Sequence, residues 1–202
     1  MFSQKTLKER ADRELEDWVA PDCHGLNFFD IDSSLQNLMT VYLPEDLRAH
    51  ITPVLRDLGE VAGNRLDDLA RTCDRHAPVL HPRNARGKNE EWIEFHPDYR
   101  EMEKIAYGDF GIHCMSHKPG VHGWPEKMPP MAKYIFTYLF VQAEFGLMCP
   151  ISVTDTSYGL LEKHGPKEAM DKFGWQMLSQ DMDEIHMGAQ FMTEKVGGSE
   201  VA

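Results

Sequence analysis

The stretch MAKYIFTYLFVQAEFGL, residues 131–147, is the most apolar part of the chain and decides its fold class. Aromatic and aliphatic side chains fall on every side of a helix drawn through it and leave almost no polar face. A helix of this kind is buried among other helices. We therefore predict a mainly α-helical protein whose central helix spans residues 131–147 and is terminated by Cys149-Pro150-Ile151-Ser152.

Amphipathic patterns before this stretch predict further helices. The segment Asp30-Ile31-Asp32-Ser33-Ser34 supplies N-cap residues for a helix through Tyr42. After Pro44, apolar residues recur every three to four positions, which predicts a long helix that ends near Cys73–His76. We expect Pro53 to kink or restart this helix. Another helix begins at Pro97. The charged residues 3–18 are interpreted as a solvated helix or a mobile arm.

The patterns after the central stretch are shorter. Thr154 or Asp155 can cap a short helix that Gly165-Pro166 stops, and residues 168–178 form another. Before the central stretch, between the long helix and the helix that begins at Pro97, two prolines predict an irregular crossing over residues 77–91. A short extended segment over 92–97 follows it. The chain as a whole then contains about six helices.

Composition restricts the class of protein. The 202 residues are 42% apolar and 27% charged, as in a soluble globular protein, and the net charge of −12 argues against binding nucleic acid through a bulk electrostatic field. Four separated cysteines without a CxxC pair indicate reduced thiols and a cytoplasmic protein. The charged N-terminus has no signal-peptide core, and the longest apolar run is too short to span a membrane.

The last residues, Met192–Ala202 (MTEKVGGSEVA), follow an apolar lead from Met187 to Phe191. We predict a strand that begins near Met187 and ends in a loop, where paired glycines let backbone N–H groups approach a ligand. A frayed C-terminus is the alternative. A strand is not stable alone, so we expect its sheet partners beyond Ala202. The expected organisation is an arm or helix over 1–30, a helical domain over 31–186 and the start of a truncated β-domain over 187–202.

The order of these motifs resembles the acyl-CoA dehydrogenase family. Met192-Thr193-Glu194-x-x-Gly197-Gly198-Ser199 is similar to its flavin-binding signature, and it follows the run V-Q-A-E-F-G-L-M-C-P over residues 141–150. Lys195, together with Phe95-His96-Pro97, resembles the branch of DNA-alkylation-response flavoproteins. The resemblance covers about residues 35–202. Glu200 and Phe191 depart from the family pattern, which has Asp and a small residue at these positions.

The resemblance implies the N-terminal helical domain of a fold that continues into a middle β-domain and a C-terminal helical bundle. It implies FAD as the cofactor, an acyl-CoA-like substrate whose α,β-bond is dehydrogenated, and a homo-oligomer, a tetramer when full length. The matching cofactor-binding residues are Met192, Thr193, Gly197, Gly198 and Ser199. The catalytic Glu is expected beyond residue 202, so the fragment alone should be inactive. The alternative is a non-catalytic flavoprotein that binds DNA through its missing C-terminal domain.

Other candidate residues have a structural interpretation beside a functional one. His113, Cys114, His117 and His122 have ligand types that suit zinc, but their spacing is irregular, and we assign no metal. Cys149 is interpreted as a buried thiol rather than a nucleophile, since the sequence names no base for it. Gln142 and Glu144 interrupt the apolar helix and either face the flavin or substrate or make structural hydrogen bonds. The basic cluster Arg83, Arg86 and Lys88 is interpreted as a solvated loop, with an interdomain or nucleic-acid contact as the alternative.

Overall fold

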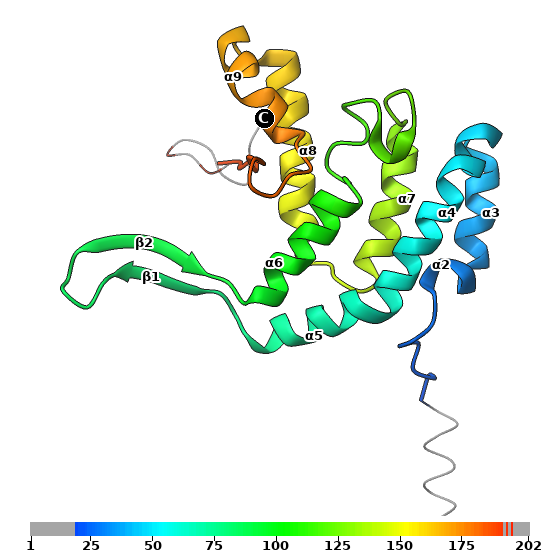
Figure 1. Ribbon diagram of the computed structural model, residues 1–202, viewed down its shortest axis with the longest axis horizontal. Coiled ribbons are helices and arrows are strands. Elements are labelled where there is room, and N and C mark those ends of the chain that lie inside the picture. The colour runs from blue at the N-terminus through cyan, green and yellow to red at the C-terminus, as the bar shows by residue number, and fades with distance from the viewer. Residues whose placement is uncertain (1–18, 192, 194, 196–202) are drawn as a thin grey trace, which may run out of the picture.

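The computed structural model describes residues 19–191, 193 and 195, and it shows a group of helices from which one β-hairpin projects (Figure 1). The predicted mainly α-helical fold is confirmed, and the predicted helix or arm over residues 3–18 lies outside the described residues. In chain order the elements are α2 (Phe28–Ile31), α3 (Ser33–Tyr42), α4 (Glu45–Val61), the π-helix η1 (Ala62–Leu66), α5 (Asp67–Arg75), β1 (Val79–Arg83), β2 (Asn89–Glu94), α6 (Pro97–Glu103), the π-helix η2 (Lys104–Asp109), the 3₁₀ helix η3 (Val121–Gly123), α7 (Pro130–Val141), α8 (Met148–His164) and α9 (Lys167–Met177).

The core forms where α4 packs against α7. Ile51, Leu55 and Leu58 repeat at intervals of four and three along α4 and are fully buried. Phe136 and Phe140 on α7 are equally inaccessible. Burial of side chains of this size contributes roughly 1.5–3 kcal/mol each before conformational entropy is subtracted. The apolar stretch from which we predicted the fold class is therefore part of the core.

The central helix differs from the prediction in its end and its exposure. It stops at Val141, not Leu147, and Tyr134 and Tyr138 project from it into solvent together with Phe145 of the following turn. The prediction of a helix buried all round was wrong because these aromatic residues occupy its outer side. No helix in the described ranges is long and apolar enough to cross a membrane.

The role of Cys149-Pro150 was also predicted wrongly. Instead of terminating a helix, these residues lie in the first turn of α8, which begins at Met148. Proline is tolerated there because its missing N–H would have no partner within the helix. Thr154 and Asp155 therefore lie inside α8 and do not cap it, whereas its predicted end at Gly165 is confirmed.

Pro53 does not restart the long helix, which was one of the two effects we expected. α4 runs from Glu45 through Pro53 to Val61, and η1 and α5 continue it to Arg75, which confirms the predicted end. Pro53 and Ala49, whose carbonyl loses a donor, are both exposed. Water can satisfy that carbonyl, so the proline is accommodated on the solvent side.

The predicted crossing over residues 77–91 is a β-hairpin in which β1 pairs antiparallel with β2. Its turn is closed by Asn84, whose Oδ1 accepts hydrogen bonds from the N–H groups of Arg86 and Lys88 at 2.9 and 3.1 Å. Gly87 has φ +78°, which glycine adopts readily. The predicted strand beginning near Met187 is not formed over the described residues 187–191, which are irregular.

The N-terminal helices are held by caps and by a close backbone approach. The Asp32 side chain accepts from the N–H of Leu35 at 2.8 Å, which confirms the predicted cap. The N–H of Gly25 donates to the carbonyl of Gly63 at 2.8 Å. A Cβ on Gly63 would lie 1.7 Å from the carbonyl oxygen of Leu26, so only glycine lets residues 25–29 lie against η1.

We predict that Gly63→Ala destabilises the protein by about 2–3 kcal/mol, because backbone atoms must move to admit the methyl group. Gly159→Ala in α8 is the matched control, since its Cβ would meet nothing closer than 3.8 Å. That control should be neutral or stabilising by up to about 1 kcal/mol. Urea unfolding followed by circular dichroism measures both, and equal effects would contradict the assignment of the close approach.

Candidate functional site

Of the predicted cofactor-binding residues, only Thr193 is among the described residues, and its side chain is exposed. Met192, Gly197, Gly198 and Ser199 lie outside the described residues, so the structure does not test their assignment to the flavin. What it shows is how the chain reaches them. Residues 187–191 lie against α8 in an irregular conformation, with Phe191 almost fully exposed.

Two threonines of α8 hold this segment. The Oγ1 of Thr154, which is fully buried, accepts a hydrogen bond from the backbone N–H of Gly188 at 3.1 Å. The same hydroxyl donates to the carbonyl of Pro150 at 2.8 Å. The Thr156 Oγ1 accepts from the Gln190 amide at 3.0 Å. From the sequence we predicted Thr154 only as a possible helix cap, because the residues that contact α8 here are 34 positions further along the chain.

Gly188 allows the segment to approach α8 closely. A Cβ at this position would lie 2.5 Å from the Cβ of Ser157 and 3.1 Å from the Cα of Thr154. These atoms belong to a helix and cannot move independently, so a side chain would push the segment away. The segment that leads into Met192-Thr193 is therefore placed by backbone contact with α8.

A buried charged group holds α8 itself in place. One carboxylate oxygen of Asp155 accepts from the Nε2 of His117 at 2.6 Å, and the other accepts from the ammonium group of Lys133. Burial alone would raise the pKa of Asp155, but the hydrogen bonds from His117 and Lys133 outweigh it and hold the pKa below its usual range. The carboxylate therefore joins α8 to α7 and to the loop after η2.

The histidines that we considered as zinc ligands and did not assign to a metal have separate partners. The Nε2–H of His113 donates to the carbonyl of Ser179 at 3.1 Å, and that of His122 donates to the carbonyl of Phe110 at 2.9 Å. Burial lowers the pKa of His113 to about 4 and also lowers the pKa of His122, so both are neutral at pH 7. Since His117 pairs with Asp155, the three imidazoles stabilise the loop individually.

Among the described residues, the groups close enough to share a cation are His24, Asp67 and Asp68, which lie elsewhere on the surface. The Nε–H of Arg71 donates to Asp67 at 2.8 Å and already occupies one of these carboxylates. The arrangement is a set of surface ion pairs, and we assign it no ligand.

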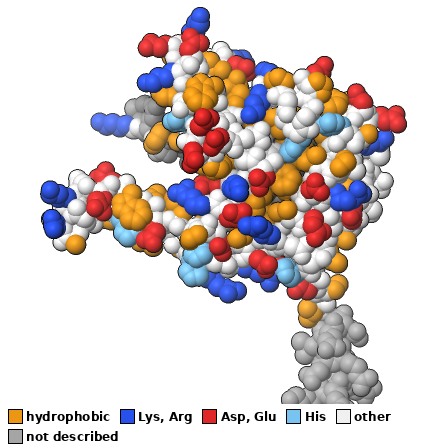
Figure 2. All heavy atoms as spheres, in the orientation of Figure 1, with side chains coloured by type: hydrophobic (Ala, Val, Ile, Leu, Met, Phe, Trp, Pro, Cys, Tyr) orange, Lys and Arg blue, Asp and Glu red, His pale blue; other side chains and the backbone are white. Residues whose placement is uncertain are grey.

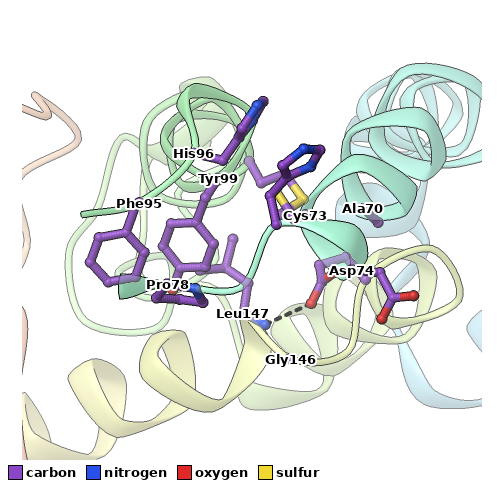
Figure 3. A pocket seen from close by; sticks show the side chains of 12 residues that line it. Ala70, Cys73, Asp74, Pro78, Phe95, His96, Tyr99, Gly146 and Leu147 are labelled. Atoms are coloured by element: carbon purple, nitrogen blue, oxygen red, sulfur yellow. Dashed lines mark hydrogen bonds between the residues drawn. The ribbon is translucent and has the colours of Figure 1, made fainter. Parts of the chain in front are cut away.

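A cavity of about 280 Å³ lies between α5, α6 and the connection from α7 to α8 (Figure 3). Cys73, Tyr99 and Leu147 line it, and burial raises the pKa of both Cys73 and Tyr99. The carboxylate of Glu144 accepts from the N–H of Leu147 at 2.9 Å, the dashed contact in Figure 3, and also lines the cavity. This position is compatible with both alternatives for Glu144, a place near the flavin or substrate and a structural hydrogen bond.

Cys149 is exposed, so the prediction of a buried thiol was wrong. The reason is the early start of α8, which places Cys149 on the outer side of its first turn. All four cysteines are free, as predicted. The amide of Gln142 donates to the carbonyl of Tyr138 at 3.4 Å, at the exposed end of α7.

The arrangement of the helices is that of the N-terminal helical domain of the acyl-CoA dehydrogenase fold. Two solved structures share this fold. The first, Bd2924 in its apo-form, has a TM-score of 0.76 at 23% identity over 87% of this chain and 34% of that chain. The second, Caenorhabditis elegans ACDH-11 in complex with C11-CoA, has a TM-score of 0.70 at 23% identity over 89% of this chain and 30% of that chain.

Residues 19–184 match the adaptive response protein AidB N-terminal domain, and the chain belongs to this family. The acyl-CoA dehydrogenase family member 11 of Caenorhabditis elegans is 25% identical over 191 residues, which are 91% of this chain and 29% of that protein. The predicted membership of the acyl-CoA dehydrogenase family and of its alkylation-response branch is thereby confirmed. The chain spans about a third of the length of these relatives.

We predict that Asp155→Asn destabilises the protein by about 3 kcal/mol at pH 7, because the ammonium group of Lys133 loses its buried partner. The folded pKa of Asp155 is depressed, so its contribution is full above the unfolded pKa of about 4 and disappears as the pH falls through the folded value. The free energy of unfolding of the variant should therefore fall less steeply than that of the native protein as the pH is lowered. Asp183→Asn in an exposed turn is the control and should change neither quantity.

Proposed function

We propose that this chain is the N-terminal part of a longer FAD-dependent acyl-CoA dehydrogenase-like flavoprotein, an oxidoreductase that dehydrogenates the α,β-bond of an acyl-CoA thioester. Family membership supports the class. The related ACDH-11 was solved with C11-CoA, which supports an acyl-CoA-like ligand. In this proposal residues 31–186 are the helical domain, residues 187–202 begin the β-domain, and the protein is a cytoplasmic homo-oligomer, a tetramer at full length.

The observation that carries the proposal is the attachment of residues 188–190 to α8. The hydrogen bonds from Gly188 to Thr154 and from Gln190 to Thr156 fix the point from which the chain enters the Met192-Thr193 motif. Thr193 is exposed, and in this proposal its hydroxyl faces the cofactor. FAD would accept the hydride from the substrate at this site. Met192, Thr193, Gly197, Gly198 and Ser199 would supply backbone N–H groups and hydroxyls that stabilise negative charge on its ring and phosphates.

No carboxylate of this chain is assigned as the base that removes the α-proton. Glu144 lines the cavity beside α6, but its Oε1 already accepts a hydrogen bond from Leu147. We place the catalytic Glu in sequence beyond residue 202. Residues 1–202 alone are then inactive, because the site lacks both the base and the far side of the cofactor pocket.

A second function follows from the family itself, which is that of an adaptive response protein. In this alternative the flavoprotein is non-catalytic and binds DNA through a C-terminal domain. The net charge of −12 makes this chain an unsuitable surface for DNA. The DNA contact would then have to come from a basic domain outside it.

The test compares residues 1–202 with the same protein extended by its downstream coding sequence. We expect the longer protein to bind FAD stoichiometrically and to reduce it with an acyl-CoA, and the shorter one to do neither. Turnover by residues 1–202 would contradict the placement of the catalytic Glu. A longer protein that binds FAD and DNA but leaves the flavin oxidised with every acyl-CoA would favour the alternative.

We predict that Thr154→Val releases the segment before the flavin motif, because valine has nearly the same shape and cannot accept from Gly188. Loss of one hydrogen bond of about 1 kcal/mol should raise amide exchange at Gly188 by about five- to tenfold. Thr154→Ser retains the hydroxyl and should restore protection. Hydrogen exchange of residues 1–202 measures both, and equal exchange in the two variants would contradict the role of the hydroxyl.

A further inference from the structure

The cavity between α5, α6 and the connection from α7 to α8 lies at the root of the β-hairpin (Figure 3). Pro78, the residue before β1, and Phe95, the residue after β2, both line it. The other walls come from α5, from α6 and from residues 144–147. Its volume of about 280 Å³ is close to the lower limit of small-molecule sites, roughly 300 Å³. A ligand that fills it is therefore small.

The apolar part of the cavity is formed by side chains that other contacts hold in place. The rings of Phe95 and Tyr99 stack with their centroids 4.6 Å apart. The guanidinium group of Arg100 lies 4.4 Å from the Phe95 centroid, pairs with Glu103 at 2.6 Å and is not part of the lining. Leu147 is buried. An apolar body that enters the cavity therefore meets walls that are already formed.

The polar side chains of the cavity have unused capacity for hydrogen bonds. Within the part of the chain that the structure describes, neither the thiol of Cys73 nor the hydroxyl of Tyr99 has a hydrogen-bond partner. Glu144 accepts from the N–H of Leu147 through Oε1 at 2.9 Å, and its second carboxylate oxygen has no such bond there. Half-buried polar groups of this kind can be satisfied by a ligand.

The charge of the cavity is negative. Of the described residues that line it, Asp74 and Glu144 are acids and none is a lysine or arginine. The Nδ1 of His96 accepts from the N–H of Asp98 at 3.2 Å, which leaves this imidazole uncharged. Burial raises the pKa of the Cys73 thiol, and the carboxylates of Asp98 and Glu144 raise it further. The field that keeps this thiol protonated disfavours an anionic ligand and favours a cation.

The basic side chains of the hairpin do not offset this field. Figure 2 shows that they gather at the far end of the hairpin, whereas the cavity lies at its root. The negative charge in the cavity is therefore available to a ligand.

We propose that this cavity binds a small organic cation, a protonated primary amine on an aromatic body. The ammonium group donates to the carboxylate of Glu144 and to the hydroxyl oxygen of Tyr99. The apolar body lies between the aromatic wall and Leu147, where the ring of Tyr99 adds attraction for the cation. This site goes beyond the proposed function, because the segment that leads to the flavin motif lies against α8 and contributes nothing to it.

The first experiment titrates residues 1–202 with three phenyl compounds that differ mainly in the charge of the polar group. They are 2-phenylethylamine, 2-phenylethanol and phenylacetate, measured by calorimetry in phosphate buffer at neutral pH. We expect a dissociation constant of about 0.1–1 mM for the amine, at least about tenfold weaker binding of the alcohol and no binding of the carboxylate. Equal affinity for the amine and either of the others, or no binding of the amine, would overturn the proposal.

The second experiment locates the site by amide NMR and by substitution. The amine should shift the amide of Leu147, because this N–H donates to Glu144, and should leave the amide of Gly188 unchanged. Glu144→Gln keeps an oxygen for Leu147 and removes the charge, so the affinity for the amine should fall at least about tenfold. Tyr99→Phe keeps the stacked ring and should lower the affinity about three- to tenfold.

Glu168→Gln at the exposed start of α9 is the matched control, since it removes the same charge elsewhere. It should leave the affinity unchanged, and circular dichroism should show unchanged helix in every variant. Equal effects of Glu144→Gln and Glu168→Gln, or an unshifted Leu147 amide, would overturn the assignment. An acyl-CoA that shifts this amide and displaces the amine would place the proposed substrate in the cavity instead and would also overturn it.

Discussion

The buried carboxylate of Asp155 is the constraint on which the candidate site depends. It accepts hydrogen bonds from His117 and Lys133, and so ties α8 to α7 and to the loop that follows η2. A carboxylate in such a position is costly unless every lone pair is used. The cost makes the arrangement specific, because a shift of α8 along α7 would leave charges unpaired.

The position of α8 determines how the chain leaves the helical domain. Thr154, next to Asp155, presents the hydroxyl that holds Gly188, while Ser157 one turn on excludes any side chain at that glycine. The carboxylate of Asp155 and the hydroxyl of Thr154 belong to one turn of α8. The direction in which the chain enters the Met192-Thr193 motif is therefore coupled to the same packing that stabilises the domain.

Helices were predicted correctly from the sequence where a single pattern, such as helical period or a cap, was present. They were predicted wrongly where one residue type is common in two different positions. The α4 to α5 run, the Asp32 cap and the start of α6 at Pro97 follow from helical period and capping, and all were predicted. Cys149-Pro150 was ambiguous, because proline is equally common just after a helix and in its first turn. The aromatic content around Tyr138 suggested burial, yet it marks an outer surface.

The hairpin was predicted only in part, as an extended segment over residues 92–97 that overlaps the end of β2 at 92–94. The bulge at Glu90–Glu91 shifts the alternation of apolar and polar residues by one position, so the first half of β2 does not continue the period of a strand. Pro82 argues against a strand at β1, because proline is uncommon inside strands. The contacts of Asp155 and Thr154 were missed for another reason, since they join residues between 22 and 38 positions apart. Local pattern contains no information on such pairs.

The surfaces available for association are separate from the folding core. The core lies between α4 and α7, whereas exposed apolar side chains gather on the hairpin and in a groove between α3 and α7 lined by Leu38, Tyr134 and Tyr138. Because each core side chain packs on helices of this same chain, the helical fold can persist when the outer aromatic and hairpin residues change. Exposed apolar groups weaken solubility and add nothing to the core. Exposed apolar groups that gather in this way are typical of surfaces that contact other molecules or domains.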